Sequence, residues 1–361
     1  MSIFDLFRPS KEHKATINQS TTVTVKPKEN LLAAGLAAGL AWPHDCRVGS
    51  CGTCRCYLRK GKIKPLNDFS YVLTQDQLNS GMILACQTAL KSDVEIEVEL
   101  DAESSATEIV NCGGTLKQVR NLTHDIIEML ISCDKDMPAD MKAGQYAEIS
   151  HENLEKPRSY SFASSPQQGN PRELLFFVRH VPGGEFTDWL FERDQTGTRF
   201  NIGVPYGNFW LRDSEKPMIC IAGGSGMSAL KAILEHAAHN KIKRDAYFFF
   251  GARAQRDLYC RSEMETIREN WTDDKNFKFV EVLSDEPEDS DWDGPRGFVT
   301  QHLKEEYIDK GVVDASQCEA YLCGPPPMID AAIAVLAENN MSEDQIFYDK
   351  FLDASSIPGG R

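Results

Sequence analysis

Long hydrophobic runs are what this 361-residue sequence most clearly lacks. The longest, residues 31–42, has 12 residues and contains two glycines, whereas a membrane-spanning helix needs about 20 apolar residues. Residues 1–14 contain neither the apolar core nor the cleavage site of a secretory signal. The sequence therefore predicts a cytoplasmic protein that is not an integral membrane protein.

Positive charge is also scarce. Lys and Arg total 39 against 54 Asp and Glu, which gives a net charge of -15. This balance argues against nucleic acid as a partner, because phosphate recognition needs clustered Lys and Arg. Residues 1–100 nevertheless carry 12 basic and 10 acidic side chains, while residues 101–361 carry 27 and 44. The change in composition predicts a domain boundary near residue 100.

Histidine is sparse, and its eight copies are scattered. Neither a 2-His-1-carboxylate set nor paired E-x-x-H motifs occur, and these would mark an oxygen-activating metal site. The chain is therefore not expected to activate oxygen itself. No internal repeat is present either.

Cysteine, by contrast, is abundant, with 11 copies that suggest metal or redox chemistry in a reducing compartment. Cys46, Cys51 and Cys54 form C-x4-C-x2-C, and Cys86 follows after a further 31 residues. This is the spacing of plant-type [2Fe–2S] ferredoxins, in which four thiolates hold the cluster. Zinc is the alternative, but zinc sites usually pair two C-x2-C-like halves, and the second half is missing. Cys56 is expected to be a non-ligand on the following strand.

Hydrophobic periodicity divides the chain into three regions with different patterns of strands and helices. A hairpin, a helix over 31–40, a Cys/Gly-rich loop and a strand over 94–100 make a small α+β unit, followed by a polar linker at 101–108. Short strands between Gly/Pro turns then predict an antiparallel barrel. These strands are expected at 115–120, 126–133, 145–150, 174–181 and 199–204, with a helix at 185–192.

After residue 217 strands and helices alternate, which predicts a parallel, doubly wound sheet. Strands are expected at 218–222, 246–251, 277–283 and 320–323, and helices at 227–239, 261–270, 299–307 and 328–338.

The cysteine loop carries a family resemblance. The stretch PHDCRVGSCGTCRC resembles the ferredoxin domain of electron-transfer components of bacterial oxygenases, and the resemblance continues through the whole chain. It is greatest for reductases of the xylene monooxygenase type. The resemblance implies a β-grasp [2Fe–2S] domain at residues 15–102, an FAD-binding β-barrel at 109–212 and an NAD-binding α/β domain at 213–361.

Residues 158–161, Arg-Ser-Tyr-Ser, match the R-x-Y-[ST] signature of ferredoxin reductase-like flavin domains. Such a site uses an Arg against flavin phosphate, a Tyr on the isoalloxazine ring and a Ser hydroxyl that reaches flavin N5. A barrel Tyr can equally belong to the core, but residues 181–187 support the flavin interpretation, because glycine N–H groups that open a helix bind pyrophosphate. The predicted flavin residues are Arg158, Ser159, Tyr160, Ser161, His180, Val181, Gly183, Gly184 and Thr187.

A glycine-rich loop between a strand and a helix is typical of a dinucleotide phosphate site. Gly223, Gly224, Ser225 and Gly226 form it here and match the G-G-[ST]-G loop of the reductase family, although a tight turn could also demand glycine. The C-G-P motif at 323–325 ends a later strand. The resemblance places Cys323 beside the nicotinamide, with Gly324 and Pro325 as binding residues, while an inert buried thiol is the alternative.

Two further segments complete the predicted site. Asp257 favours a ribose 2′-hydroxyl and Arg253 a 2′-phosphate, and the resemblance favours NADH. Phe351 is the candidate cover for the second face of the flavin, although core aromatics on a terminal strand would look the same. Ser161, Cys323 and Phe351 are the candidate catalytic residues.

The predicted function is electron transfer from NADH through FAD and a [2Fe–2S] cluster to a separate oxygenase. A di-iron monooxygenase is the favoured partner, including a membrane-bound hydroxylase onto which the reductase docks, and a Rieske dioxygenase is the alternative. A zinc-stabilised adaptor without redox activity is the interpretation from a different class.

Overall fold

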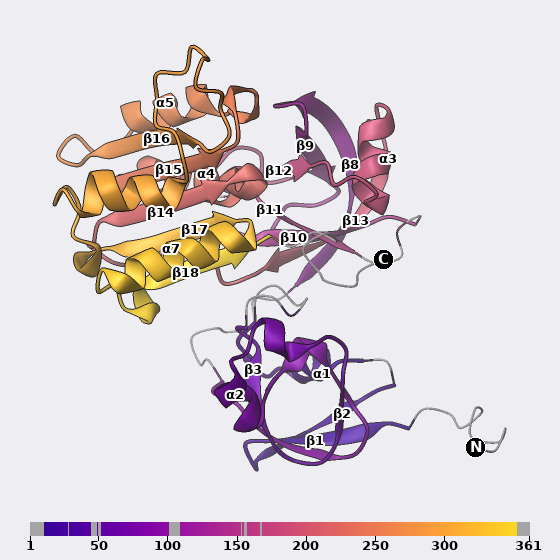
Figure 1. Ribbon diagram of the computed structural model, residues 1–361. Helices are drawn as coiled ribbons and strands as arrows, with labels where there is room; N and C mark the ends of the chain where they lie inside the picture. The colour runs from indigo at the N-terminus through magenta and orange to yellow at the C-terminus, as the bar shows by residue number, and fades with distance from the viewer. Residues whose placement is uncertain are drawn as a thin grey trace. The chain divides into compact units, whose positions relative to one another are not determined.

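The computed structural model describes residues 11–27, 29–44, 49, 52–100, 109–152, 154, 157–166 and 168–351. The chain divides after Glu108 into two compact units (Figure 1). The predicted ligands Cys46 and Cys51 and the predicted linker at 101–108 lie outside the described residues.

The first unit is a small α+β fold with a mixed five-stranded sheet in the order β2-β1-β7-β3-β5. Its sheet strands are β1 (His13–Ile17), β2 (Thr21–Val25), β3 (Arg55–Lys60), β5 (Met82–Leu84) and β7 (Val94–Glu97). The remaining elements are α1 (Leu31–Ala37), α2 (Gln75–Asn79) and the β4 (Ile63–Pro65) and β6 (Thr88–Leu90) pair.

Helix α1 begins where the sequence predicts and ends earlier. The Asn30 side chain accepts the Ala33 N–H at 2.8 Å, an N-cap bond that fixes the start. The helix stops at Ala37, before Gly39 with φ of +78°, although the prediction continued to residue 40. Trp42 then returns over Gly35, where an added Cβ would lie 2.8 Å from the indole. This close packing puts Trp42, only 1% exposed, into the core.

The second unit starts with an antiparallel six-stranded sheet in the order β11-β10-β13-β8-β9-β12. A bridge between Phe162 and Phe176 joins its two edges, so the sheet closes in part into a barrel. Buried Phe186 and Leu190 attach α3 to the barrel core. The bounds are β8 (Val110–Asn121), β9 (Ile126–Cys133), β10 (Tyr146–Ser150), β11 (Arg158–Ser161), β12 (Glu173–Arg179), α3 (Glu185–Glu192) and β13 (Arg199–Tyr206).

A five-stranded parallel sheet follows in the order β16-β15-β14-β17-β18 (Figure 1). Helices α4 and α5 share the apolar core on one face, and α6 and α7 share a second core on the other. This arrangement confirms the doubly wound sheet. The bounds are β14 (Met218–Gly223), α4 (Met227–His239), β15 (Ala246–Ala252), α5 (Arg261–Glu269), β16 (Phe277–Leu283), α6 (Val299–His302), β17 (Glu319–Gly324), α7 (Pro326–Glu338) and β18 (Ile346–Lys350).

A buried ion pair stabilises the segment around residues 212–216, which joins the barrel to the parallel sheet. The Arg244 guanidinium, 1% exposed, donates to Glu319 at 2.7 Å and to the Arg212 carbonyl at 3.2 Å. It also donates to the Lys216 carbonyl. The Tyr321 hydroxyl donates to the same Glu319 oxygen at 2.8 Å. The network therefore connects the joining segment to two strands at their amino ends.

We expect Glu319→Ala to destabilise the second unit by about 3–5 kcal/mol, because it leaves the buried Arg244 charge without a partner. Urea unfolding followed by tryptophan fluorescence measures this loss. The control is Asp309→Ala, which breaks the surface pair with Lys304 and should cost about 1 kcal/mol or less. Equal shifts in the two variants would contradict the expectation.

Candidate functional site

The cysteine loop of the first unit is shaped to present N–H groups to sulfur. Cys54 and Cys86 are 3% and 1% exposed, and the Cys86 N–H donates to Cys54 Sγ at 3.5 Å. Gly49 and Gly52 have φ of +82° and +75°, a conformation that L side chains rarely adopt. N–H groups directed at thiolates stabilise an anionic cluster. The described part of the loop therefore fits a [2Fe–2S] cluster.

Cys56 is buried on β3, and only Cys54 and Cys86 of the predicted ligands can be placed. The four-ligand set and the non-ligand role of Cys56 stay predictions.

The predicted flavin residues gather where β11 meets the start of α3. Arg158 Nη2 lies 3.0 Å from a Glu185 carboxylate oxygen at the first turn of α3. The Tyr160 and Phe186 ring centroids are 5.7 Å apart, and burial raises the pKa of the Tyr160 phenol. The Gly184 N-cap has no side-chain hydrogen bond, so the first N–H groups of α3 are available to an anion. A guanidinium beside a helix N-terminus suits a pyrophosphate.

The loop before α3 leaves space for a ligand. Gly183 has φ of +80°, and nothing lies within 4 Å of the position that a Cβ would take. Thr187 holds the loop, because its hydroxyl accepts the Val181 N–H at 3.1 Å and donates to the Val181 carbonyl at 3.0 Å. His180 contacts Asp188 at 2.8 Å and stacks on Phe191. Thr187 and His180 thus shape the loop that the phosphate would contact.

The glycine loop after β14 and the loop after β17 fit closely against each other. A Cβ on Gly226 would lie 2.9 Å from Gly324 Cα and would overlap the Cys323 carbonyl. A Cβ on Gly223 would lie 2.7 Å from Met328 Sδ. Packing against backbone therefore requires glycine at 226, whereas the closest contact at 223 is with the flexible Met328 side chain. Gly224 differs: its φ is +55°, and the nearest atom to its absent Cβ is Arg179 Nη1 at 3.7 Å.

Two of the three predicted catalytic residues meet at one unpredicted carboxylate, and the third, Phe351, reaches the same site through Gly324. Ser161 Oγ donates to Asp349 Oδ2 at 3.4 Å, and Asp349 pairs with Cys323 across β17 and β18. The Phe351 N–H donates to the Gly324 carbonyl at 2.8 Å, and its ring packs against the core that contains Cys323. Cys323 has no exposed surface, and burial, with Asp349 nearby, raises its thiol pKa. Barrel and sheet thus contribute to one site.

Two residues of the site were not predicted from the sequence. Arg179, at the end of β12, donates to Asp125 at 2.9 Å and faces Gly224. Asp349 lies between Tyr348 and Lys350, in a segment whose aromatic residues resemble ordinary core. Neither belongs to a motif, so their roles follow only from contacts between the barrel and the parallel sheet.

The predicted adenosine segment follows β15. The Asp257 carboxylate accepts the Ala254 N–H at 2.9 Å and lies 3.4 Å from His124 Nδ1. Arg253 is exposed. Asp257 is thus already engaged by the protein, and its contact with a ribose stays a prediction.

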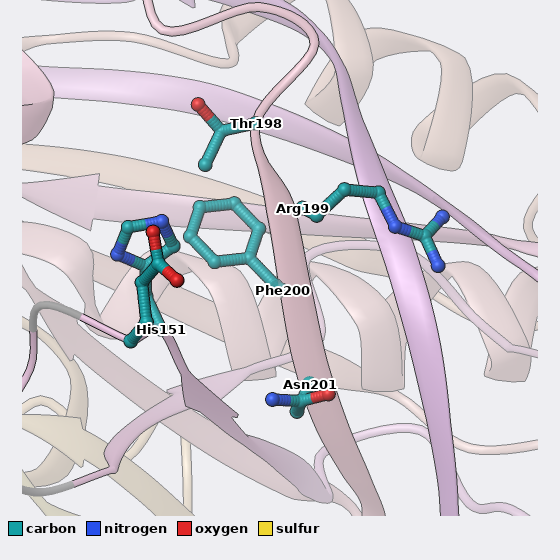
Figure 2. Close-up of a pocket in the computed structure, with 6 residues that line it drawn as sticks. His151, Thr198, Arg199, Phe200 and Asn201 are labelled. Atoms are coloured by element: carbon teal, nitrogen blue, oxygen red, sulfur yellow. The ribbon is translucent and has the colours of Figure 1, made fainter.

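A separate pocket of about 420 Å³ opens beside the start of β13 (Figure 2). His151 stacks on Trp189 at 5.4 Å and meets Phe200 edge-on at 5.8 Å. Arg199 points away and donates to Asp134. No predicted site residue is among those that line it, which are His151, Glu152, Thr198, Arg199, Phe200 and Asn201.

Comparisons with known proteins cover both units. Residues 15–91 match the 2Fe-2S iron-sulfur cluster binding domain, and residues 220–333 match the oxidoreductase NAD-binding domain. The chain is 39% identical over 350 residues to the xylene/toluene monooxygenase electron transfer component of Pseudomonas putida, covering 97% of this chain and 96% of that protein. It belongs to the electron-transfer components of oxygenases.

Other members of this family support the same assignment. The anthranilate 1,2-dioxygenase electron transfer component of Acinetobacter baylyi is 32% identical, over 92% of this chain and 94% of that protein. The crystal structure of the Amycolatopsis cytochrome P450 reductase GcoB superposes with a TM-score of 0.78 at 29% identity, covering 94% of this chain and 98% of that chain.

As a member of this family, the chain is an oxidoreductase that transfers electrons from a nicotinamide dinucleotide through FAD and a [2Fe–2S] cluster to an oxygenase component. The predicted family, fold class, cofactors and electron-transfer function are confirmed, and the zinc-adaptor interpretation is set aside. Within the described parts of the chain, no helix combines the length and apolar character needed to cross a bilayer.

Proposed function

We propose that the chain is the cytoplasmic, NADH-dependent reductase of a di-iron monooxygenase that acts on an aromatic hydrocarbon. The observation that supports this partner is the 39% identity over nearly the whole chain to a xylene/toluene monooxygenase component. The matches at 15–91 and 220–333 support the proposed division into domains at 15–102, 109–212 and 213–361. A hydroxylase bound to a membrane is the docking partner that we propose.

The proposed residue roles follow from the contacts. When bound, FAD and the cluster supply the redox chemistry: FAD accepts two electrons from the nicotinamide donor, and the cluster passes them on one at a time. Arg158 and the N-terminus of α3 hold the pyrophosphate of FAD, and Ser161 orients the flavin edge. Gly224 and Arg179 receive the pyrophosphate of NADH, while Cys323 and Phe351 border the nicotinamide. Cys46, Cys51, Cys54 and Cys86 bind the cluster.

A Rieske dioxygenase is the second candidate partner, and the 32% identity to the anthranilate dioxygenase component favours it. The two partners can be separated by reconstitution. We would mix the purified reductase and NADH either with membrane vesicles containing the xylene monooxygenase hydroxylase or with the anthranilate dioxygenase oxygenase component. Hydroxylated product is then measured against NADH consumed.

We expect coupled product only with the monooxygenase, or with at least tenfold higher efficiency there, which corresponds to about 1.4 kcal/mol in the transition state. Higher coupling to the dioxygenase would overturn the proposed partner. Cytochrome c reduction by NADH, without any oxygenase, serves as the control for an intact electron-transfer path.

A further inference from the structure

The carboxyl ends of β15 and β16 stay joined beyond the sheet. The Ser284 N–H donates to the Ala252 carbonyl at 3.0 Å, and the Asp285 N–H donates to the Arg253 carbonyl at 2.8 Å. Ligands of open parallel sheets bind outside the carboxyl ends of the strands, and the strand next to the glycine loop carries the adenosine ribose. In this sheet β14 pairs with both β15 and β17, and β15 is the neighbour that follows next along the chain. The loop of residues 284–297, here called the acidic loop, therefore borders the ribose position.

One side chain in the adenosine segment is held by two carboxylates of the acidic loop. The Gln255 backbone N–H donates to Glu286 Oε2 at 2.9 Å, and the Gln255 side-chain Nε2 donates to Glu286 Oε1 at 2.9 Å. The same amide nitrogen donates to Asp291 at 2.8 Å. Gln255 lowers the pKa of Glu286 by these hydrogen bonds, so Glu286 is ionised at neutral pH.

The basic side chains of the adenosine segment, residues 253–257, do not by themselves explain a preference for NADH over NADPH. Arg253 and Arg256 are exposed in the same segment, and two guanidinium groups would favour a 2′-phosphate. Asp257 is directed instead to Ala254 and His124. Glu286 and Asp291 add two further carboxylates that contact this segment through Gln255.

We propose that Glu286 and Asp291, fixed on Gln255, select NADH by placing two negative charges where NADPH carries its 2′-phosphate. This inference rests on the proposed NADH-dependent function and identifies the residues that determine its specificity. A 2′-hydroxyl can donate to a carboxylate, whereas a phosphate dianion is repelled, and juxtaposed like charges strongly disfavour the wrong ligand. Gln255 contributes by holding both carboxylates beside the adenosine segment.

The test compares two double variants of the full-length holoprotein. Glu286→Gln/Asp291→Asn removes both carboxylates that hold Gln255. The matched control, Glu288→Gln/Asp289→Asn, removes the same charge from exposed positions of the same loop that do not contact Gln255. For each protein, kcat and KM are measured with NADH and with NADPH, using ferricyanide as acceptor. Dissociation constants for 2′-AMP and 5′-AMP are measured by calorimetry.

We expect the first variant to lower the ratio of NADH to NADPH efficiency at least tenfold, mainly through a lower KM for NADPH. Its affinity for 2′-AMP should rise by a similar factor, while 5′-AMP changes little. The control variant should alter the ratio by less than threefold. Equal changes in both variants would show that the effect comes only from the net charge of the loop, which would overturn the inference. An unchanged 2′-AMP affinity in the first variant would overturn it as well. Failure of the wild type to oxidise NADH would instead refute the proposed function, and the nucleotide affinities would still test the acidic loop.

Discussion

Cys54→Ala should lose electron transfer to cytochrome c down to the background rate, while NADH still reduces the flavin and ferricyanide is still consumed. Cys54 is 3% exposed and accepts the Cys86 N–H, so it occupies the buried inner side of the cysteine loop. Removing a thiolate ligand removes the cluster, and metal binding is coupled to the order of its loop. The flavin and nicotinamide residues belong to the other compact unit, so they should keep their geometry.

Visible absorption and electron paramagnetic resonance of the reduced protein report the cluster directly. The matched control is Cys56→Ala, which removes a thiol that is just as buried, two residues along the chain. It should retain the cluster spectrum and cytochrome c reduction. Loss of the cluster in Cys56→Ala but not in Cys54→Ala would show that Cys56, and not Cys54, is the cluster ligand. Loss of ferricyanide reduction in a folded Cys54→Ala protein would contradict the order of carriers.

The sequence predicted most of the architecture because hydrophobic periodicity records which face of each element is buried. Four of the five strands of the parallel sheet were predicted, helped by apolar runs such as residues 246–251, whereas β18 was not among the predicted strands. The strand β11 was missed, although its Arg-Ser-Tyr-Ser motif was recognised. Four residues with three polar side chains have no strand-like periodicity, and their place is set by pairing with β10.

The site was predicted only as far as motifs extend. Ser161, Cys323 and Phe351 lie in recognisable segments, and the structure brings them together. Arg179 and Asp349 do not, because their positions depend on how the barrel packs against the parallel sheet. Asp257 shows a different case: its residue type suggests a ribose ligand, and its side chain also closes a local turn, so its contact with a ribose stays a prediction.

Gly226→Val is expected to have the largest effect in the nicotinamide half of the site. Gly226 has ordinary helical φ and ψ of -61° and -15°, so a side chain there is not excluded by backbone conformation. It is excluded by space, because its Cβ would overlap the Cys323 carbonyl and lie 2.9 Å from Gly324 Cα. Those contacts are with backbone, which cannot rotate away. The substitution must therefore separate the glycine loop from the loop that carries Cys323.

We expect flavin reduction by NADH to slow about 100-fold or more, since a displacement of about 1 Å at a reacting centre has an effect of that size. Stopped-flow absorbance measures this rate. Dithionite should still reduce flavin and cluster fully, which separates a displaced nicotinamide site from lost cofactors. A variant that keeps both cofactors and reacts with NADH within threefold of wild type would show that the two loops do not form the nicotinamide site. The required proximity of Gly226 and Gly324 would then be a packing feature only.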